Sequence, residues 1–478
     1  MRFISTRGGD KVTIDEAISK VIAVNGGLFV PEKLPLISDA EMEDMLDMGF
    51  PERTAKIIKN FFSEIDEGGL LSALEEAYSR FKGDDPAPLV RIDDGVYMLE
   101  LFHGPTASSK DMAVAPLPHI FKRCFTEKVT LVSATSGDLG KSAIECFRSV
   151  ENCGILVLYP NDGLSKMQKL QLVTEEGKNV SVVAVKGSFD DCFGELKKAI
   201  AEGAPVACAN SINFASLAPR IVYYFSAYLD LLSSAQIEEG EAVDFFIPSG
   251  NLGEAMGAYY AKLMGLPIRK IHIAANENNS LVSFFKTGNF VRAGEVVKTT
   301  SPSMDIALPA DLERLIFEIS GRDGRLTAKR MASLSSEGSF SLTQDELVKL
   351  QEIFDCGSAN EETCVEAMYD VFIDTGYTMD TCTGCAMKVA HDWYEKNKKD
   401  ETKAVIVAID SPYKFPQDVL YAVTGNDVKD SFKGVKRLHD ATAMAVPACV
   451  KNLRDKPVNF TKIIDIKGIA AEINEFLK

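Results

Sequence analysis

The sequence lacks any long hydrophobic run and has a deficit of basic residues. No apolar stretch approaches the ~18 residues that are needed to span a bilayer. The first seven residues, MRFISTR, contain no apolar core of the kind that a signal peptide carries. The chain has 52 Lys and Arg residues but 69 Asp and Glu residues, and its formal net charge is −17. This charge argues against nucleic acid or an anionic membrane as the main partner, so we expect a cytoplasmic protein that acts on a small molecule.

Cysteine is also sparse, with 10 residues that mostly stand singly along a chain of 478. This pattern is typical of reduced thiols in a cytosolic protein rather than of a disulfide framework. The exception is the pair Cys382-x-x-Cys385. Because no second pair and no cluster of histidines accompanies it, two half-buried thiols are a better interpretation than a zinc site. We therefore predict no metal centre.

The remaining composition is ordinary for a globular protein, and the length suits two or three domains. Residues 1–90 show mostly amphipathic helical spacing. From residue 90 onward, short runs rich in Val and Ile alternate with helical stretches, which predicts parallel sheets with helices on both faces. Residues 320–380 return to a helical, charged pattern, and we expect them to form an inserted or covering subdomain. The predicted strands are residues 129–133, 154–159, 180–185, 206–209, 243–247, 271–275 and 404–409.

The stretch at residues 99–118, LELFHGPTASSKDMAVAPLP, combines a strand-like apolar run, a Gly-Pro turn and a helical segment. Small hydroxyl residues just before the helical part are typical N-cap residues, so Lys110 lies where a strand passes into a helix. A cation at this position is mildly disfavoured by the helix dipole. Lys110 is therefore either an ordinary surface lysine or a reactive lysine that its apolar neighbours desolvate.

Two further segments place glycines and hydroxyl groups between a predicted strand and a predicted helix. They are ATSGDLG at residues 134–140 and PSGNLG at residues 248–253. Free backbone N–H groups and the helix dipole favour an anion at such a turn. Each segment alone also fits a plain β–α connection, but two such turns together with the lysine turn are far more specific.

These motifs together resemble those of the threonine synthase family. HGPT, followed after a four-residue step by Lys-Asp, is similar to the segment that carries the pyridoxal-phosphate lysine in that family. TSGDLG resembles the turn that holds the substrate carboxylate, and SGNLG resembles the cup that holds the cofactor phosphate. STRGGDKVT and NGGLFVP near the N-terminus, TSPSMD at residues 300–305 and DSPYKF at residues 410–415 also match family segments, so the resemblance covers essentially the whole chain.

The resemblance implies an α/β fold of fold type II, which is tryptophan synthase β-like. Such a fold has two parallel-rich sheets flanked by helices, and here an N-terminal helical domain precedes them. The division that we expect is an N-terminal domain at residues 1–92, a small cofactor and substrate domain at residues 93–225 and a large cofactor-binding domain at residues 226–478.

The resemblance also implies a set of site residues. Lys110 is the expected catalytic residue, and it would form the Schiff base with pyridoxal 5′-phosphate. The residues expected to bind the cofactor are Lys110, Ser249, Gly250, Asn251, Leu252, Gly253 and Ser411. The residues expected to bind the substrate are Thr135, Ser136, Gly137, Asp138 and Lys141.

The activity that the resemblance implies converts O-phospho-L-homoserine and water to L-threonine and phosphate. The phosphate of this substrate needs cations, and the candidates by position are Lys141, Lys166, Lys169 and Arg220. Two alternatives stay open, namely a diverged phospho-lyase that acts on a related amino-acid phosphate and a non-catalytic ligand-binding relative. We expect a monomer or a homodimer with an anionic amino-acid ligand.

The sequence departs from the family pattern at Ser109, Leu139, Leu252, Cys382 and Ile409. The family commonly has Thr at position 409, where it lies against the pyridine nitrogen of the cofactor. Ile409 cannot form a hydrogen bond, so Asp410 or Ser411 would have to serve. Because strand residues alternate between faces, either Asp410 or the pair Ile409 and Ser411 points at the ring. We expect Ser411 in this role, because a buried unpaired carboxylate is costly.

Overall fold

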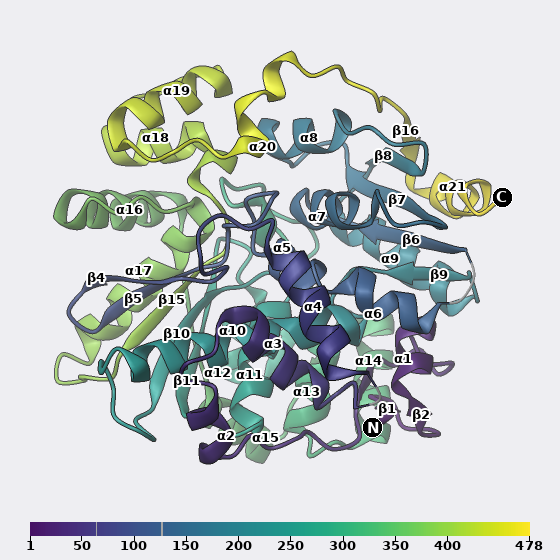
Figure 1. Cartoon of the computed structure of the whole chain (residues 1–478). Coiled ribbons are helices and arrows are strands. Elements are labelled where there is room, and N and C mark those ends of the chain that lie inside the picture. The colour runs from purple at the N-terminus through teal and green to yellow at the C-terminus, as the bar shows by residue number, and fades with distance from the viewer. Residues whose placement is uncertain (64, 126–127) are drawn as a thin grey trace.

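Two sheets with mostly parallel strands organise the molecule (Figure 1). The computed structural model describes residues 1–63, 65–125 and 128–478. The larger sheet has six strands in the order β14-β11-β10-β15-β5-β4, and only the β4–β5 pair is antiparallel. Its strands are β4 (Leu89–Asp93), β5 (Val96–Glu100), β10 (Val243–Pro248), β11 (Ile268–Ala275), β14 (Phe354–Ser358) and β15 (Ala404–Ala408).

The smaller sheet has five parallel strands in the order β16-β8-β7-β6-β9. Every residue of its strand β7 is buried, as is every residue of β10 in the larger sheet. Burial on both faces explains why these strands show continuous apolar runs rather than alternation. The α/β prediction is thus confirmed. The strands are β6 (Val129–Ala134), β7 (Cys153–Pro160), β8 (Val180–Lys186), β9 (Val206–Cys208) and β16 (Ile463–Asp465).

The N-terminal region combines helices with a small antiparallel sheet in the order β2-β1-β3. Sequence reasoning predicted its helices but not this sheet, whose strands are only two to four residues long. Capping boxes at Thr13 and Ser38 set the starts of the first two helices. The elements are β1 (Arg2–Ser5), β2 (Val12–Thr13), α1 (Ile14–Lys20), β3 (Phe29–Pro31), α2 (Asp39–Asp44), α3 (Phe50–Lys59) and α4 (Glu67–Tyr78).

Helices cover both large sheets. Helices α7, α9 and α21 contact the five-stranded sheet, and α11, α12 and α17 contact the six-stranded sheet. Helix α10 packs against α11, α5 and α3, and it is buried along almost its whole length. The helices after α4 are α5 (Lys110–Val114), α6 (Leu117–Cys124), α7 (Asp138–Phe147), α8 (Lys166–Val173), α9 (Phe189–Ala201), α10 (Phe214–Ser233), α11 (Gly253–Leu263), α12 (Ser280–Thr287), α13 (Leu312–Ile319), α14 (Gly324–Glu337), α15 (Gln344–Ile353), α16 (Glu361–Thr375), α17 (Thr381–Lys396), α18 (Pro416–Thr424), α19 (Ser431–Thr442), α20 (Ala448–Lys451) and α21 (Ile469–Phe476).

Short elements complete the chain. Within residues 320–380 the predicted helices are present, but β14 also joins the edge of the larger sheet. Its sequence, FDCGS, has a single large apolar residue and therefore gives no strand signal. The remaining short elements are the hairpin strands β12 (Asn289–Val291) and β13 (Ser339–Ser341) and the 3-10 helices η1 (Pro302–Met304), η2 (Pro412–Lys414), η3 (Leu453–Asp455) and η4 (Ile466–Gly468).

The β4–β5 hairpin and strand β16 lie in different sheets from the ones that the expected division of the chain implies. The boundary at residue 92 would cut through β4, and the β4–β5 hairpin belongs as a unit to the larger sheet. Strand β16, near the C-terminus, pairs with β8 of the smaller sheet, so the yellow end of the chain lies beside blue strands in Figure 1. Strand pairing between distant segments decides both placements. Among the described residues, no helix combines the length and the apolar character that crossing a membrane requires.

Candidate active site

Lys110 lies in a pocket to which the carboxyl ends of strands from both sheets contribute. The pocket is lined by Thr135 after β6, Asn210 after β9, Ser249 after β10 and Ile409 after β15. In open α/β sheets, ligands bind at this end of the strands. The arrangement thus brings the lysine turn and both glycine turns to one place, as the sequence predicted.

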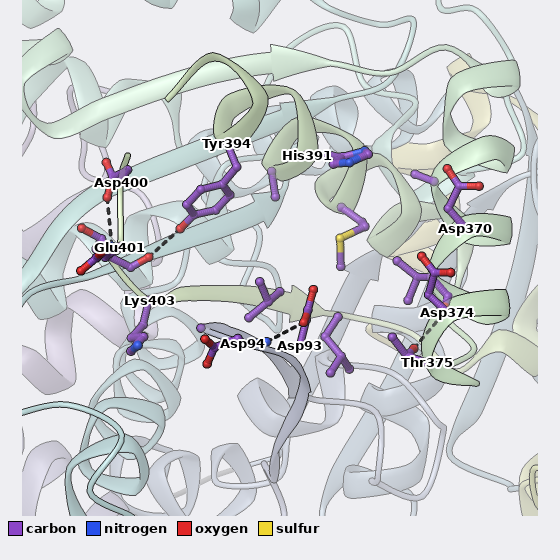
Figure 2. Close-up of a pocket in the computed structure, with 18 residues that line it drawn as sticks. Asp93, Asp94, Asp370, Asp374, Thr375, His391, Tyr394, Asp400, Glu401 and Lys403 are labelled. Carbon is purple, nitrogen blue, oxygen red and sulfur yellow. Dashed lines mark hydrogen bonds between the residues drawn. The ribbon is translucent and has the colours of Figure 1, made fainter. Parts of the chain in front are cut away.

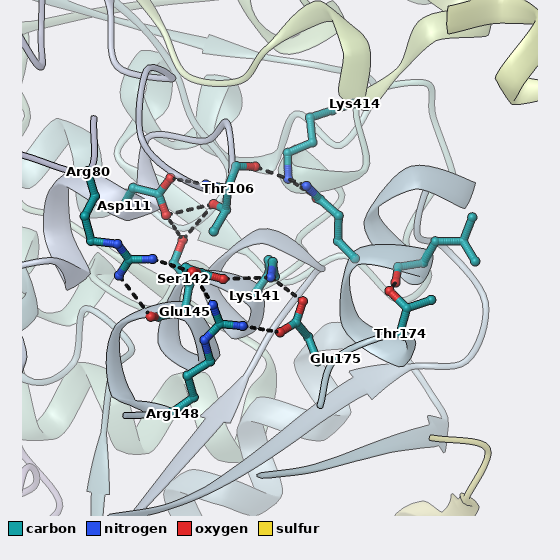
Figure 3. Close-up of polar contacts among 12 residues, drawn as sticks. Arg80, Thr106, Asp111, Lys141, Ser142, Glu145, Arg148, Thr174, Glu175 and Lys414 are labelled. Atoms are coloured by element: carbon teal, nitrogen blue, oxygen red, sulfur yellow. Dashed lines mark hydrogen bonds and ion pairs between the residues drawn. The ribbon is translucent and has the colours of Figure 1, made fainter. Parts of the chain in front are cut away.

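The lysine turn is held by a buried carboxylate. Asp111 accepts hydrogen bonds from the Thr106 N–H at 2.8 Å and its Oγ1 at 2.7 Å, and from Ser142 Oγ at 2.6 Å (Figure 3). Burial raises the pKa of Asp111, and these hydrogen bonds oppose that rise. The turn also contains Ala107 in the left-handed region, with φ +60°. These contacts fix the direction in which Lys110 leaves the start of α5.

The side chain of Lys110 reaches a carboxylate that sequence reasoning missed. Its Nζ lies 2.5 Å from Oε1 of Glu254, and Nη1 of Arg220 lies 2.5 Å from the same oxygen. Tyr223 donates its hydroxyl proton to Oε2 of Glu254. Burial alone would raise the pKa of Glu254, but the Arg220 and Lys110 cations outweigh burial and hold that pKa well below its usual range. An acid in the first turn of a helix is common, so Glu254 has no distinctive signal in the sequence.

The turn between β10 and α11 forms a cup for an anion. Leu252 adopts a left-handed conformation with φ +64°, which turns neighbouring N–H groups toward one side. Oγ of Ser249 is buried and has no hydrogen-bond partner among the described residues. A Cβ on Gly250 would lie 2.9 Å from Cδ1 of Ile306 and 3.0 Å from Cα of Met304, so only glycine fits there. An unpartnered hydroxyl at a helix N-terminus fits the phosphate group of pyridoxal 5′-phosphate.

The turn between β6 and α7 is organised by one hydroxyl. Oγ1 of Thr135 accepts hydrogen bonds from the N–H groups of Gly137 at 2.9 Å and Gly140 at 3.0 Å. Ser136 and Leu139 line the pocket beside Thr135. Asp138 does not line it, because its carboxylate accepts from Lys414 Nζ at 2.5 Å and from a glutamine amide. Three of the expected substrate residues therefore do not line the pocket, namely Gly137, Asp138 and Lys141.

Of the four cations considered for substrate phosphate, Arg220 alone is among the described residues that line the pocket. Figure 3 shows Lys141 directed to Glu145, at 3.0 Å, and to Glu175. Nζ of Lys166 lies over the ring of Phe432, and Nζ of Lys169 donates to a backbone carbonyl. Sequence position could not show which of the four cations reaches the pocket, because that depends on which carboxylate, ring or carbonyl the fold brings next to each one.

Of the residues that follow β15, Ile409 is among the described residues that line the pocket, whereas Asp410 and Ser411 are not. Ile409 lines the pocket, and its carbonyl accepts from the N–H of Ser109 at 2.6 Å. The Asp410 carboxyl is buried. Burial and the nearby carboxylates of Asp138 and Asp380 raise the pKa of Asp410 well above its usual value. Oγ of Ser411 accepts from the N–H of Tyr413 at 3.4 Å. Contact between Ser411 and the cofactor ring stays a prediction.

The thiols of Cys382 and Cys385 are fully buried, so the prediction of half-buried thiols is wrong. Both stand in the first turns of α17, which packs against the larger sheet. Sγ of Cys385 lies 3.7 Å from Sγ of Cys364 on α16. The side chain of Cys382 instead approaches Asp380 and Asp410, with ligand atoms within 4.8 Å of one another.

A larger cavity, of about 780 Å³, lies elsewhere (Figure 2). Its walls come from the β4–β5 turn, from α16 and α17 and from residues 400–403, and carboxylates such as Asp93 and Asp374 stand around it. It receives no residue of the lysine turn or of either glycine turn. The pocket around Lys110 is therefore the candidate active site, although it is not the widest opening.

Comparisons with known proteins agree with this geometry. The family model "Threonine synthase N terminus" matches residues 2–78, and "Pyridoxal-phosphate dependent enzyme" matches residues 82–410. A threonine synthase from Pseudomonas aeruginosa is 32% identical over 435 residues, which cover 89% of this chain and 91% of that protein. Human "Threonine synthase-like 1" is 32% identical over 460 residues, which cover 89% of this chain but 61% of that protein.

Solved structures give the same answer. The pyridoxal-phosphate-bound threonine synthase from Brucella melitensis has a TM-score of 0.86 and 30% identity, with 100% of this chain and 99% of that chain covered. The yeast threonine synthase has a TM-score of 0.85 and 27% identity, with 100% and 98% covered. Sequence, fold and site geometry agree, and the chain belongs to the threonine synthase family of pyridoxal-phosphate-dependent enzymes.

Proposed function

We propose that this protein is a threonine synthase that converts O-phospho-L-homoserine and water to L-threonine and phosphate. The observation that carries the proposal is the placement of Lys110 Nζ in one pocket with both glycine turns. This reaction requires three parts: a lysine that can hold the cofactor, a cup for the cofactor's phosphate and a hydroxyl-rich turn for the substrate's carboxylate.

Pyridoxal 5′-phosphate, when attached to Lys110, supplies a ring that withdraws electrons from the substrate's carbon atoms. In this chain Lys110 would hold it covalently, while Ser249, Gly250, Asn251 and Leu252 would surround its phosphate. Gly253 begins α11 directly behind them and adds the dipole of that helix.

Lys110 is the residue that we assign to proton transfer. Its Nζ can accept a proton from the substrate's α-carbon and return one to a neighbouring carbon, because no other described side chain that lines the pocket carries an amine. Glu254 then stabilises the ammonium form, since its oxygen lies 2.5 Å from Nζ. Thr135 and Ser136 orient the substrate carboxylate at the start of α7.

A second candidate function is a phospho-lyase that releases phosphate, ammonium and a 2-oxo acid from a related amino-acid phosphate. Ile409 favours it, because this apolar side chain lines the pocket where the family commonly has a hydroxyl. A change beside the ring alters how long the electron-rich state of the substrate persists. A purely ligand-binding role has less support, because a binding module has no need of the Lys110 amine in this pocket.

One incubation separates these functions. Purified protein is supplied with O-phospho-L-homoserine, and threonine, 2-oxobutyrate and free phosphate are resolved over time. Threonine in equal amount to phosphate supports the synthase, and 2-oxobutyrate in equal amount supports the lyase. Lys110→Ala is the matched inactive control, and absence of all three products from the wild-type protein contradicts both enzymatic proposals.

We further infer that the protein works in the cytoplasm, as a monomer or homodimer, on a small anionic amino acid. The formal charge of −17 and the singly placed cysteines support this inference. Sedimentation of the purified protein measures the oligomeric state directly.

A further inference from the structure

Arg220 carries a buried donor that nothing in the described protein satisfies. The residue is 2% exposed and lies in the second turn of α10. Its Nη1 donates to Glu254 at 2.5 Å, but its Nε has no hydrogen-bond partner among the described residues. An unsatisfied donor on a buried charged group is costly, so an acceptor from outside the chain is expected at this place.

Close packing of two helices directs this guanidinium to the anion cup. A Cβ on Gly257 of α11 would lie 2.7 Å from the carbonyl oxygen of Arg220 and 2.9 Å from its Cβ. The backbones of α10 and α11 can approach this closely only because position 257 is glycine. From this contact the Arg220 side chain extends to Glu254, one turn nearer to the N-terminus of α11. That end of α11 is the cup.

The charge balance of the pocket also requires a cation beside the cup. Among the described residues that line it, Lys110 and Arg220 are the cations and Glu254 is the anion. Attachment of the cofactor to Lys110 withdraws that amine from Glu254. Arg220 is then the remaining fixed positive charge near both Glu254 and an incoming phosphate dianion, and it cannot lose its proton.

We propose that Arg220 is a phosphate ligand of this pocket. Its Nε–H donates to a phosphate monoester held by the cup, and Glu254 fixes the orientation of the guanidinium through Nη1. The inference rests on the proposed function, since both the cofactor and the substrate of a threonine synthase carry such a phosphate. Arginine suits this role better than lysine, because its planar group can serve a carboxylate and a phosphate at once.

The experiment compares two cofactor forms that differ only in the phosphate. Protein from which the cofactor has been removed is titrated with pyridoxal 5′-phosphate and with pyridoxal, and both dissociation constants are read from absorbance. In Arg220→Gln we expect the constant for pyridoxal 5′-phosphate to rise by about tenfold or more, while that for pyridoxal stays unchanged. Arg220→Lys restores part of the preference. The 31P resonance of bound cofactor shifts in the same variants.

A matched control is Arg53, which lies on α3 and is paired with a residue of α10. Arg53 is also buried, and its Nη1 lies 2.5 Å from Asp230 of α10, outside the pocket. Arg53→Gln removes a buried cation of similar environment, so it lowers thermal stability without changing the preference for the phosphorylated cofactor. Circular dichroism melting of both variants identifies any general loss of folding.

A second set of measurements distinguishes the source of the phosphate. With the cofactor saturating, inhibition by inorganic phosphate and the KM for O-phospho-L-homoserine are determined for the wild type and Arg220→Gln. A rise of about tenfold in both constants, with cofactor binding unchanged, assigns Arg220 to the substrate's phosphate. If neither the cofactor constants nor the substrate and phosphate constants change in Arg220→Gln, the inference is overturned. Wild-type protein that fails to bind pyridoxal 5′-phosphate would instead contradict the proposed function itself.

Discussion

Lys110 and Glu254 are 144 positions apart in the chain, yet Nζ and Oε1 lie 2.5 Å from each other. The first stands at the start of α5 and the second in the first turn of α11. This ion pair joins the lysine turn to the phosphate cup.

The first prediction concerns covalent attachment of the cofactor. Purified protein should be yellow, and reduction with borohydride should fix the cofactor on Lys110, because its amine reaches the pocket. Peptide mapping by mass spectrometry locates the modified lysine. Lys110→Ala should remain colourless after incubation with pyridoxal 5′-phosphate, and modification of a different lysine would show that the assignment is wrong.

The second prediction concerns pH. The folded-state pKa of Glu254 is below its ordinary value of 4.5, so its contribution to stability is complete above that pH and is lost as the pH falls through the lower folded value. In Glu254→Gln this pH-dependent share disappears, and breaking the buried pair costs ~3–5 kcal/mol at neutral pH. Urea unfolding midpoints between pH 7 and pH 3 measure both effects.

A control for that measurement is Glu346→Gln, which removes another buried carboxylate paired with Arg330, outside the pocket. It should lower the unfolding midpoint without altering the cofactor's absorbance, whereas Glu254→Gln should alter both. An identical acid dependence in the wild type and Glu254→Gln would contradict the lowered pKa.

The third prediction tests the cup. In Gly250→Val the new side chain meets Ile306 and the backbone of Met304, so the turn must deform. We expect cofactor affinity to fall by more than about tenfold, or ~1.4 kcal/mol, with the fold largely kept. Gly194→Val is a suitable control, because a Cβ at that exposed position meets no atom within 4 Å. Unchanged affinity in Gly250→Val would mean that the phosphate binds elsewhere.

The fourth prediction compares Ser411 with Asp410. Asp410 is not among the described residues that line the pocket, and its charged neighbours are Asp138, Asp380 and Lys414, so Asp410→Asn should change the cofactor's absorbance only weakly. Ser411→Ala should change both the spectrum and the turnover strongly if its hydroxyl reaches the pyridine nitrogen. Absorbance spectra and rates of product release from the two variants decide the matter. The reverse order would assign the ring nitrogen to Asp410 and favour the lyase.

The sequence by itself determined the local parts of this protein. Apolar runs predicted β6, β7 and β10, because strands buried on both faces are apolar at most positions. Glycines and hydroxyl residues after β6 and β10 marked the anion turns, since backbone conformation and free N–H groups at a helix start depend on neighbouring residues. Lys110 was found in the same way, from the turn that precedes it.

Tertiary structure decided which of these parts meet. Sequence position offered Lys141 and Arg220 equally as cations, but Glu145 and Glu175 hold Lys141 outside the lining, and close packing of α10 on α11 brings Arg220 into the pocket. The pairing of β16 with β8 likewise depends on residues almost 300 positions apart. Charge pairing and strand pairing act through space, and the local sequence carries no record of which distant partner the fold will supply.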